Sequence, residues 1–162
     1  MIEVEIEDEA WSAALGDLEA ICVRAAEAAL SSLPSSLEGE CNVTILLADD
    51  ETLADLNARF RNKAGPTNVL SFPAHPSARP HLGDLALAFG VCSREADEQG
   101  KALADHLSHL VVHGVLHLVG YDHETEAEAE AMEGLERTVL AGLGVADPYA
   151  PEGAGRERDV HP

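Results

Sequence analysis

The pattern of apolar and polar positions predicts alternating strands and helices at the start of the chain. Apolar and acidic residues alternate over Ile2–Glu7, which is typical of a half-buried strand. Over Ser12–Leu30 the apolar residues recur at helical spacing, so a helix is expected there. Asn42–Ala48 is rich in β-branched and aliphatic residues and predicts a second strand.

The middle of the chain repeats this alternation. The helix after the second strand can be capped by Asp49 or Asp50. Its apolar face would consist of Leu53, Leu56 and Phe60. Thr67–Phe72 and Leu82–Ala88 predict two further strands, separated by a loop over Ala74–Pro80.

The second half of the chain is predominantly helical in its spacing. One helix is expected from about Ser93, with an interruption near Gly100. A second runs from about Lys101 to Val119 and a final one over Glu124–Leu143.

Together these elements predict an α+β fold in a single domain. A small mixed β-sheet of about four strands would be covered by about five helices, and the domain would span residues 1–146. Residues 147–162 carry no apolar period, so we expect them to form a mobile C-terminal tail.

Composition and charge narrow the class of protein. The net charge of −20 argues against a protein that coats nucleic acid with a broad basic surface. The three cysteines form no Cys-x-x-Cys pair and are expected to be reduced thiols in a cytoplasmic protein. The N-terminus has no signal-peptide pattern, and the longest apolar stretch, Leu110–Val119, is too short to span a membrane. We therefore expect no membrane association.

The basic residues are few but partly gathered. Three of the ten lie at Arg59, Arg61 and Lys63. Such a strip can engage a few phosphates, whereas tight nonspecific binding along a long RNA is not expected.

The run from His113 to His123 carries the most specific chemical signal. On a helix, His113 and His117 project from one face one turn apart. Gly120 can then end the helix in a left-handed conformation, so that His123 approaches the same point from a loop. Three neutral imidazoles with an open fourth position are typical of a catalytic zinc site, so one Zn²⁺ per chain is expected.

The residue after the first histidine limits the reaction. The spacing matches the metzincin protease pattern His-Glu-x-x-His-x-x-Gly-x-x-His, in which the Glu is the general base. Gly114 stands in its place and cannot accept a proton. A zinc held only by neutral histidines also keeps its full charge, which favours a phosphodiester over a neutral amide as substrate.

Three motifs in this order resemble the YbeY family of bacterial endoribonucleases. They are the histidine run, residues 66–73 (Pro-Thr-Asn-Val-Leu-Ser-Phe-Pro) and residues 82–85 (Leu-Gly-Asp-Leu), and the resemblance extends from about Glu3 to Tyr149. It implies a zinc-dependent, single-strand-selective endoribonuclease of the cytoplasm. The implied role is maturation of ribosomal RNA, at the 3′ end of the small-subunit rRNA, and ribosome quality control. The implied partners are single-stranded or ribosomal RNA and the small ribosomal subunit or its assembly factors, with no DNA.

The same resemblance places a catalytic arginine at Arg61, which would bind phosphate oxygens and stabilise charge in the transition state. The alternative is a solvated cation at a helix C-terminus. Lys63 is a weaker candidate for a phosphate contact. Ser71 and Asp84 could contact substrate, or could serve only packing and turn formation.

Several other polar residues have open roles. Asp122 could orient a histidine through its second ring nitrogen, or cap the following helix. His109 lies one turn before His113 and could support a ligand or simply pack. The remaining histidines have no partner spacing and are expected at the surface or in loops; they are His75, His81, His106 and His161.

Two other functions remain open at this point. A metzincin-like metallopeptidase is disfavoured by Gly114. A non-catalytic ribosome-assembly factor, in which zinc and Arg61 only anchor RNA, is disfavoured by the open coordination position.

Overall fold

A four-stranded mixed sheet forms the centre of the protein in a computed structural model that describes residues 1–33 and 41–149. The strand order is β1-β2-β4-β3. Strands β1, β2 and β4 run parallel, and β3 pairs antiparallel with β4 at one edge. The strands are β1 (Ile2–Ile6), β2 (Asn42–Ala48), β3 (Val69–Pro73) and β4 (His81–Ala88).

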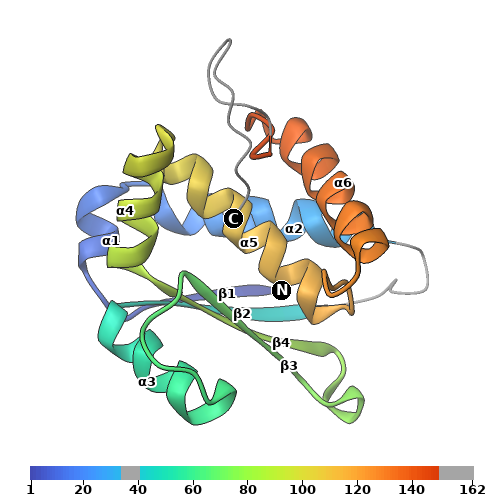
Figure 1. Ribbon diagram of the computed structural model, residues 1–162, viewed down its shortest axis with the longest axis horizontal. Coiled ribbons are helices and arrows are strands. Elements are labelled where there is room, and N and C mark those ends of the chain that lie inside the picture. The colour runs from blue at the N-terminus through green and yellow to red at the C-terminus, as the bar shows by residue number, and fades with distance from the viewer. Residues whose placement is uncertain (34–40, 150–162) are drawn as a thin grey trace.

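Helices cover both faces of this sheet (Figure 1). Helices α2, α4, α5 and α6 gather on one side, with α5 lying across the sheet, and α3 lies on the other. The α-helices are α1 (Ala10–Ala14), α2 (Leu18–Ser31), α3 (Asp50–Arg61), α4 (Phe89–Gln99), α5 (Leu103–Leu118) and α6 (Glu126–Gly142). A 3-10 turn over Pro76–Ala78 lies within the expected loop.

Helix α5 is the element around which the larger core forms. Eleven of its sixteen residues are buried, so it is apolar on nearly all sides, as expected of a central helix. Its valines and leucines pack with α2, α6 and the β2 and β4 side chains that point to the same face. A smaller cluster under α3 includes Leu53, Leu70 and Ala86 and covers the opposite face.

The expected α+β single domain with a mixed four-stranded sheet is confirmed. The helix expected over Ser12–Leu30 is instead two helices, because Leu15 is extended and the chain turns before α2. Trp11 on α1 is fully buried, and its indole N–H donates to the Ala48 carbonyl oxygen at 3.0 Å. This contact holds α1 at the end of β2.

Helix α4 begins at Phe89, four residues before the expected start at Ser93. No local side chain caps this helix. The cap comes from Asp50 on α3, whose carboxylate accepts a hydrogen bond from the Val91 backbone N–H at 3.0 Å. Gly100 ends the helix with a φ of 67°, which agrees with the interruption expected there.

The packed part of the chain extends beyond the expected boundary at residue 146. Arg137 pairs with Asp147 at 3.2 Å, and the Tyr149 ring lies under the Arg137 guanidinium at 5.3 Å. These contacts hold Asp147 and Tyr149 against α6. The rest of the expected tail, with His161, lies outside the described residues. In the described part of the chain, no helix has the length and apolar character needed to cross a membrane.

Candidate metal centre

The C-terminal end of α5 brings three histidines to one point. His113 and His117 lie one turn apart on the helix, and Gly120, with a φ of 106°, turns the chain back so that His123 approaches them. The ring centroids are 4.6 Å apart for His113 and His117, and 5.1 Å apart for His117 and His123. One nitrogen from each ring lies within 4.8 Å of the others, so this group could hold a metal ion.

The three rings have the chemistry of a ligand set. A metal ligand must be neutral imidazole. The pKa of His117 is lowered, first by burial and then by the neighbouring His113 and His123 rings. Because the set combines half-buried rings with the exposed His123, an ion can reach it from solvent.

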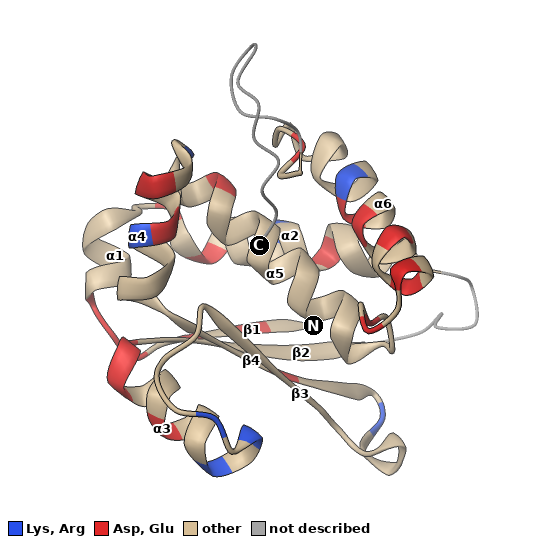
Figure 2. Cartoon of the chain, in the orientation of Figure 1, with Lys and Arg blue, Asp and Glu red and all other residues tan. Residues whose placement is uncertain are grey.

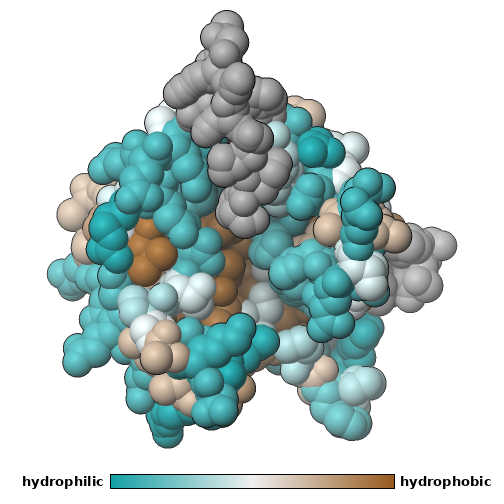
Figure 3. Space-filling view, in the orientation of Figure 1, coloured by the Kyte–Doolittle hydropathy of each residue, from teal (hydrophilic) through white to brown (hydrophobic). Residues whose placement is uncertain are grey.

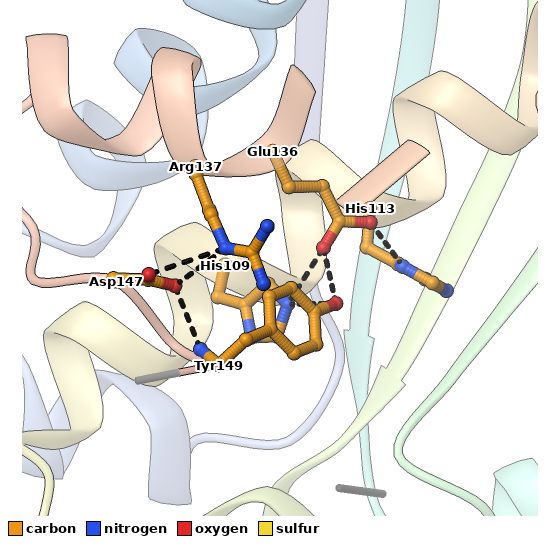
Figure 4. A network of polar contacts seen from close by, with 6 residues as sticks. All are labelled: His109, His113, Glu136, Arg137, Asp147 and Tyr149. Carbon is orange, nitrogen blue, oxygen red and sulfur yellow. Dashed lines mark hydrogen bonds and ion pairs between the residues drawn. The ribbon is translucent and has the colours of Figure 1, made fainter. Parts of the chain in front are cut away.

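Glu136 on α6 was missed by the sequence analysis and is the central polar group behind these histidines. Its side chain is fully buried. One carboxylate oxygen accepts a hydrogen bond from His113 Nδ1 at 2.6 Å, and the other lies 3.0 Å from His109 Nε2 and within hydrogen-bond distance of the Tyr149 hydroxyl. Figure 4 shows the carboxylate lying between His113 on one side and His109 and Tyr149 on the other.

The contact with Glu136 determines which nitrogen of His113 is free. A carboxylate that accepts from Nδ1–H leaves the Nε2 lone pair for a metal, which is a common arrangement behind metal-bound histidines. The group His109, His113 and Glu136 could itself be considered a metal site. However, the 2.6 Å separation of nitrogen and oxygen is that of a direct charge-assisted hydrogen bond, so we assign these residues to the support of His113.

The electrostatics of this network favour an ionised Glu136 carboxylate beside a neutral His109 ring. Burial alone would raise the pKa of Glu136, but hydrogen bonds from His109 and His113 outweigh it and lower that pKa to about 2. Burial lowers the pKa of His109. Burial, followed by the adjacent charge of Glu136, raises the pKa of Tyr149, which therefore remains a hydroxyl donor.

The signal for Glu136 is present in the sequence but was not used. Met132, Glu136 and Leu140 are four residues apart on α6, and all three are buried. A glutamate in the middle of an apolar helical stripe needs a buried partner, because an unpaired buried charge is costly. Tyr149 was missed because it lies in the segment expected to be mobile.

Arg61, at the end of α3, is brought to the edge strand β3. Its guanidinium donates a hydrogen bond to the Ser71 carbonyl oxygen and lies 5.7 Å from the centre of the Phe72 ring. The Ser71 hydroxyl donates to the Gly114 carbonyl oxygen on α5 at 3.4 Å. Ser71 thus connects Arg61 with the residue that follows His113.

The other predicted substrate contacts lie in different parts of the structure. Lys63 is exposed in the loop after α3, whereas Ser71 is buried against α5. Asp84 pairs with Phe72 in the ladder and lies on the α3 face, one position away from Leu85 on the α5 face. The pleat therefore puts Ser71 and Asp84 on opposite faces, and Asp84 contacts His81 at 3.0 Å instead.

Two further expectations were wrong or only partly right. Asp122 does not cap α6, because Thr125 does so with Glu128 in a capping box. Its carboxylate accepts the His123 backbone N–H at 2.7 Å and so shapes the turn that carries this histidine. His106, expected in a loop or at the surface, is buried on α5 and lies 2.9 Å from Glu95.

Gly114 is required by the packing of α5 on the sheet. A Cβ atom at this position would lie 2.7 Å from Leu85 Cδ2. Because Leu85 is fully buried, it has little room to move. The residue that replaces the protease glutamate therefore faces the core, and α5 approaches β4 closely because it has no side chain there.

Comparisons with known proteins identify the family that the chain matches. A family model described as Endoribonuclease YbeY matches residues 3–144. A protein named Endoribonuclease YbeY from Maricaulis maris is 53% identical over 95% of this chain and 94% of its own length. The protein of that name from Paramagnetospirillum magneticum is 50% identical over 93% of this chain and 96% of its own.

A solved structure supports the fold alone. The solution structure of a Thermotoga maritima protein superimposes with a TM-score of 0.57, covering 89% of this chain and 92% of that one, at 24% sequence identity.

Substitution of Gly114 tests the packing argument. Gly114→Glu should lower the free energy of unfolding by at least about 2 kcal/mol, because a charged side chain is forced against the buried Leu85. Gly134→Glu is a matched control, because a Cβ on this glycine of α6 meets no atom within 4 Å. Urea unfolding of both variants provides the measurement. Equal stability of Gly114→Glu and the native protein would contradict the packing argument.

The carboxylate network predicts a specific acid sensitivity. Because the folded pKa of Glu136 is lowered to about 2 from 4.5, its contribution to stability is complete above pH 4.5 and is lost as the pH falls toward 2. This contribution should be about 3 kcal/mol. Glu136→Gln should therefore be less stable than the native protein at pH 6 and should approach it near pH 2, measured by urea unfolding of metal-free protein. A difference that stays constant with pH would contradict the assignment.

Proposed function

The chain belongs to the endoribonuclease YbeY family, and we propose that it is a zinc-dependent endoribonuclease that cleaves single-stranded RNA during ribosomal RNA maturation. The expected substrate is the 3′ end of small-subunit rRNA, encountered in the cytoplasm on the small subunit or its assembly intermediates. A contribution to ribosome quality control follows from the same activity. The observation that supports the proposal is the convergence of three imidazoles, grouped without a fourth ligand candidate among the described residues, together with an arginine that Ser71 connects to the residue after His113.

His113, His117 and His123 would hold the ion. When bound, zinc would supply a Lewis acid for the phosphoryl group and a water whose pKa lies near 7. The role of Glu136 would be to keep Nδ1 of His113 protonated, so that this ring presents Nε2 to the ion. Asp122 would hold the turn that brings His123 to the site.

Arg61 would bind the phosphate next to the scissile bond. The guanidinium has five N–H donors, and the contact with the Ser71 carbonyl oxygen uses a single terminal nitrogen, Nη2. The remaining donors can form a forked pair with phosphate oxygens and stabilise the charge that develops on them in the transition state. Lys63, exposed two residues later, would attract a neighbouring phosphate.

A peptidase is the weaker proposal because the protease glutamate has no counterpart. Gly114 holds that position and faces Leu85, so even a restored side chain would start in the core.

Purified protein incubated with single-stranded RNA, duplex RNA and a peptide, with and without chelator, distinguishes the functions. Cleavage of single-stranded RNA that the chelator abolishes is expected. Zinc-dependent RNA binding without cleavage would identify the non-catalytic alternative.

The metal assignment predicts the zinc content of two histidine variants. The native protein should contain about one zinc per chain, and His117→Ala should lose most of it because two imidazoles form an incomplete site. His75→Ala is the control, since the ring of this exposed histidine hydrogen-bonds Ser77 and is not part of the candidate metal-binding group. Elemental analysis after dialysis provides the measurement. Equal zinc in His117→Ala and the native protein would place the metal elsewhere.

The role of Arg61 predicts a loss of turnover without a loss of metal. Arg61→Ala should lower kcat by roughly a hundredfold, or about 2.7 kcal/mol, at unchanged zinc content. Arg61→Lys should recover RNA binding more fully than cleavage, because it keeps the charge but loses the planar fork. Arg24→Ala, an exposed cation on α2, is the control for net charge. All rates should be compared at one modest salt concentration.

For this prediction the Lys variant is decisive. Cleavage at the native rate by Arg61→Lys would mean that the residue provides only a positive charge. Native turnover in Arg61→Ala would mean that it is a solvated helix-end cation.

A further inference from the structure

Phe60 is exposed although the helical pattern predicts it on the apolar face of α3. The residue is 62% exposed, while Leu53 on the same helix is fully buried. Among the described residues, the other large hydrophobic side chains with high exposure are Met1 and Ile6, both on or beside the edge strand β1. An aromatic ring left in water at the end of a helix forgoes the free energy of burial, so its position calls for a reason.

The ring of Phe60 is held in place rather than free. It packs edge-on against Phe72 of β3, with centroids 5.6 Å apart and planes at 75°. Phe72 in turn lies 5.7 Å from the Arg61 guanidinium. A ring fixed by such contacts loses little conformational entropy when a flat partner binds to it.

The surroundings of Phe60 are cationic in an otherwise acidic protein. Arg59, Arg61 and Lys63 flank it within five residues, although the whole chain has a net charge of −20. Arg59 is partly neutralised by Asp55 at 3.2 Å. Figure 2 shows the basic residues gathered at the end of α3, whereas acidic residues lie along α6. Figure 3 shows that hydrophilic side chains dominate the rim of this face of the molecule around apolar atoms in its middle.

This combination fits one chemical class of partner better than others. The cations would repel a basic protein surface. The carboxylates of an acidic protein surface would pair with the cations but would offer no flat apolar group to the exposed ring. A polynucleotide supplies both complements at once, a phosphate for each cation and a planar base for the ring.

The position of Phe60 ties it to the proposed active site. Phe60 precedes Arg61, and Arg61 contacts Ser71, whose hydroxyl reaches Gly114 beside His113. A base on Phe60 would thus belong to a nucleotide close to the phosphate at Arg61. This step rests on the proposed function.

We propose that Phe60 is a stacking platform for one unpaired RNA base next to the cleaved phosphodiester, and that it selects single strands. A base within a duplex is covered on both faces by its neighbours and is paired along its edge, so its face is not available to the ring. An unstacked base offers a free face, and any of the four bases can occupy the platform.

The experiment measures the affinity for a labelled 12-nucleotide single-stranded RNA by fluorescence anisotropy, in chelator to prevent cleavage. Phe60→Ala and Phe60→Leu should weaken binding by about 5- to 150-fold, the range for loss of one stacked base. Phe60→Trp should bind at least as tightly as the native protein. Ile6→Ala removes another exposed apolar side chain and should change nothing.

A single abasic nucleotide moved along the RNA locates the stacked base. For the native protein, the abasic nucleotide should weaken binding strongly at one position. In Phe60→Ala that additional loss should disappear, because the ring and the base form the same interaction.

Salt dependence separates stacking from charge. Phe60 variants should keep the native slope of affinity against salt, whereas Arg61→Ala should reduce it.

The outcomes separate this proposal from the proposed function. If the native protein cleaves single-stranded RNA but Phe60→Ala binds it equally well, the platform is wrong while the nuclease stands. If Phe60→Leu binds RNA with native affinity, the ring makes only an ordinary apolar contact and the stacking proposal is wrong. An abasic effect that persists in Phe60→Ala would place the base elsewhere.

Circular dichroism and thermal unfolding check that the variants are folded. Because Phe60 is exposed, only small changes in Tm are expected. If the native protein neither binds nor cleaves RNA, the proposed function itself fails.

Discussion

The carboxylate of Glu136 is the point at which the helical layer and the histidine site depend on each other. A fully buried carboxylate is stable only when its oxygens are satisfied, and here His113, His109 and Tyr149 satisfy them from α5 and from the segment after α6. The same contacts fix the distance between α5 and α6 and the orientation of the His113 ring. A structural requirement of the core thus also preorganises the site, since the ring need not be reoriented to bind an ion.

On the other side of α5, a close approach to the sheet has a similar double effect. Gly114 lets the helix backbone lie against Leu85, which brings its carbonyl oxygen within reach of the Ser71 hydroxyl on the edge strand. Ser71 in turn accepts a hydrogen bond from Arg61, which comes from α3 on the opposite face. Because β3 is the edge strand of the sheet formed by the described residues, the end of α3 can reach round this edge and join the two faces.

Local patterns were sufficient for the strands, the central helix and the three histidines. The histidine site is encoded within eleven residues by helical spacing and a glycine whose φ must be positive, so no distant contact was needed to find it. What failed depends on tertiary contacts. Helix α4 is capped by Asp50 from another helix, Phe60 touches Phe72 of the edge strand yet stays mostly exposed, and Tyr149 contacts the buried Glu136. The sequence motif also did not reveal that Ser71 and Asp84 lie on opposite faces of the sheet, because a motif alone does not determine which face of a strand each residue takes.

The charge distribution explains how an acidic protein can act on a polyanion. At physiological salt, charges beyond about 8 Å are largely screened, so the acidic surface along α6 repels RNA only where RNA approaches it. Three cations at the end of α3 and an ion at the histidines would attract a short stretch of backbone locally. Such a surface holds long RNA weakly, and recognition then depends on features of one or two nucleotides. A fixed aromatic ring beside Arg61 supplies such a feature, because it distinguishes an unstacked base from a paired one without reading its identity.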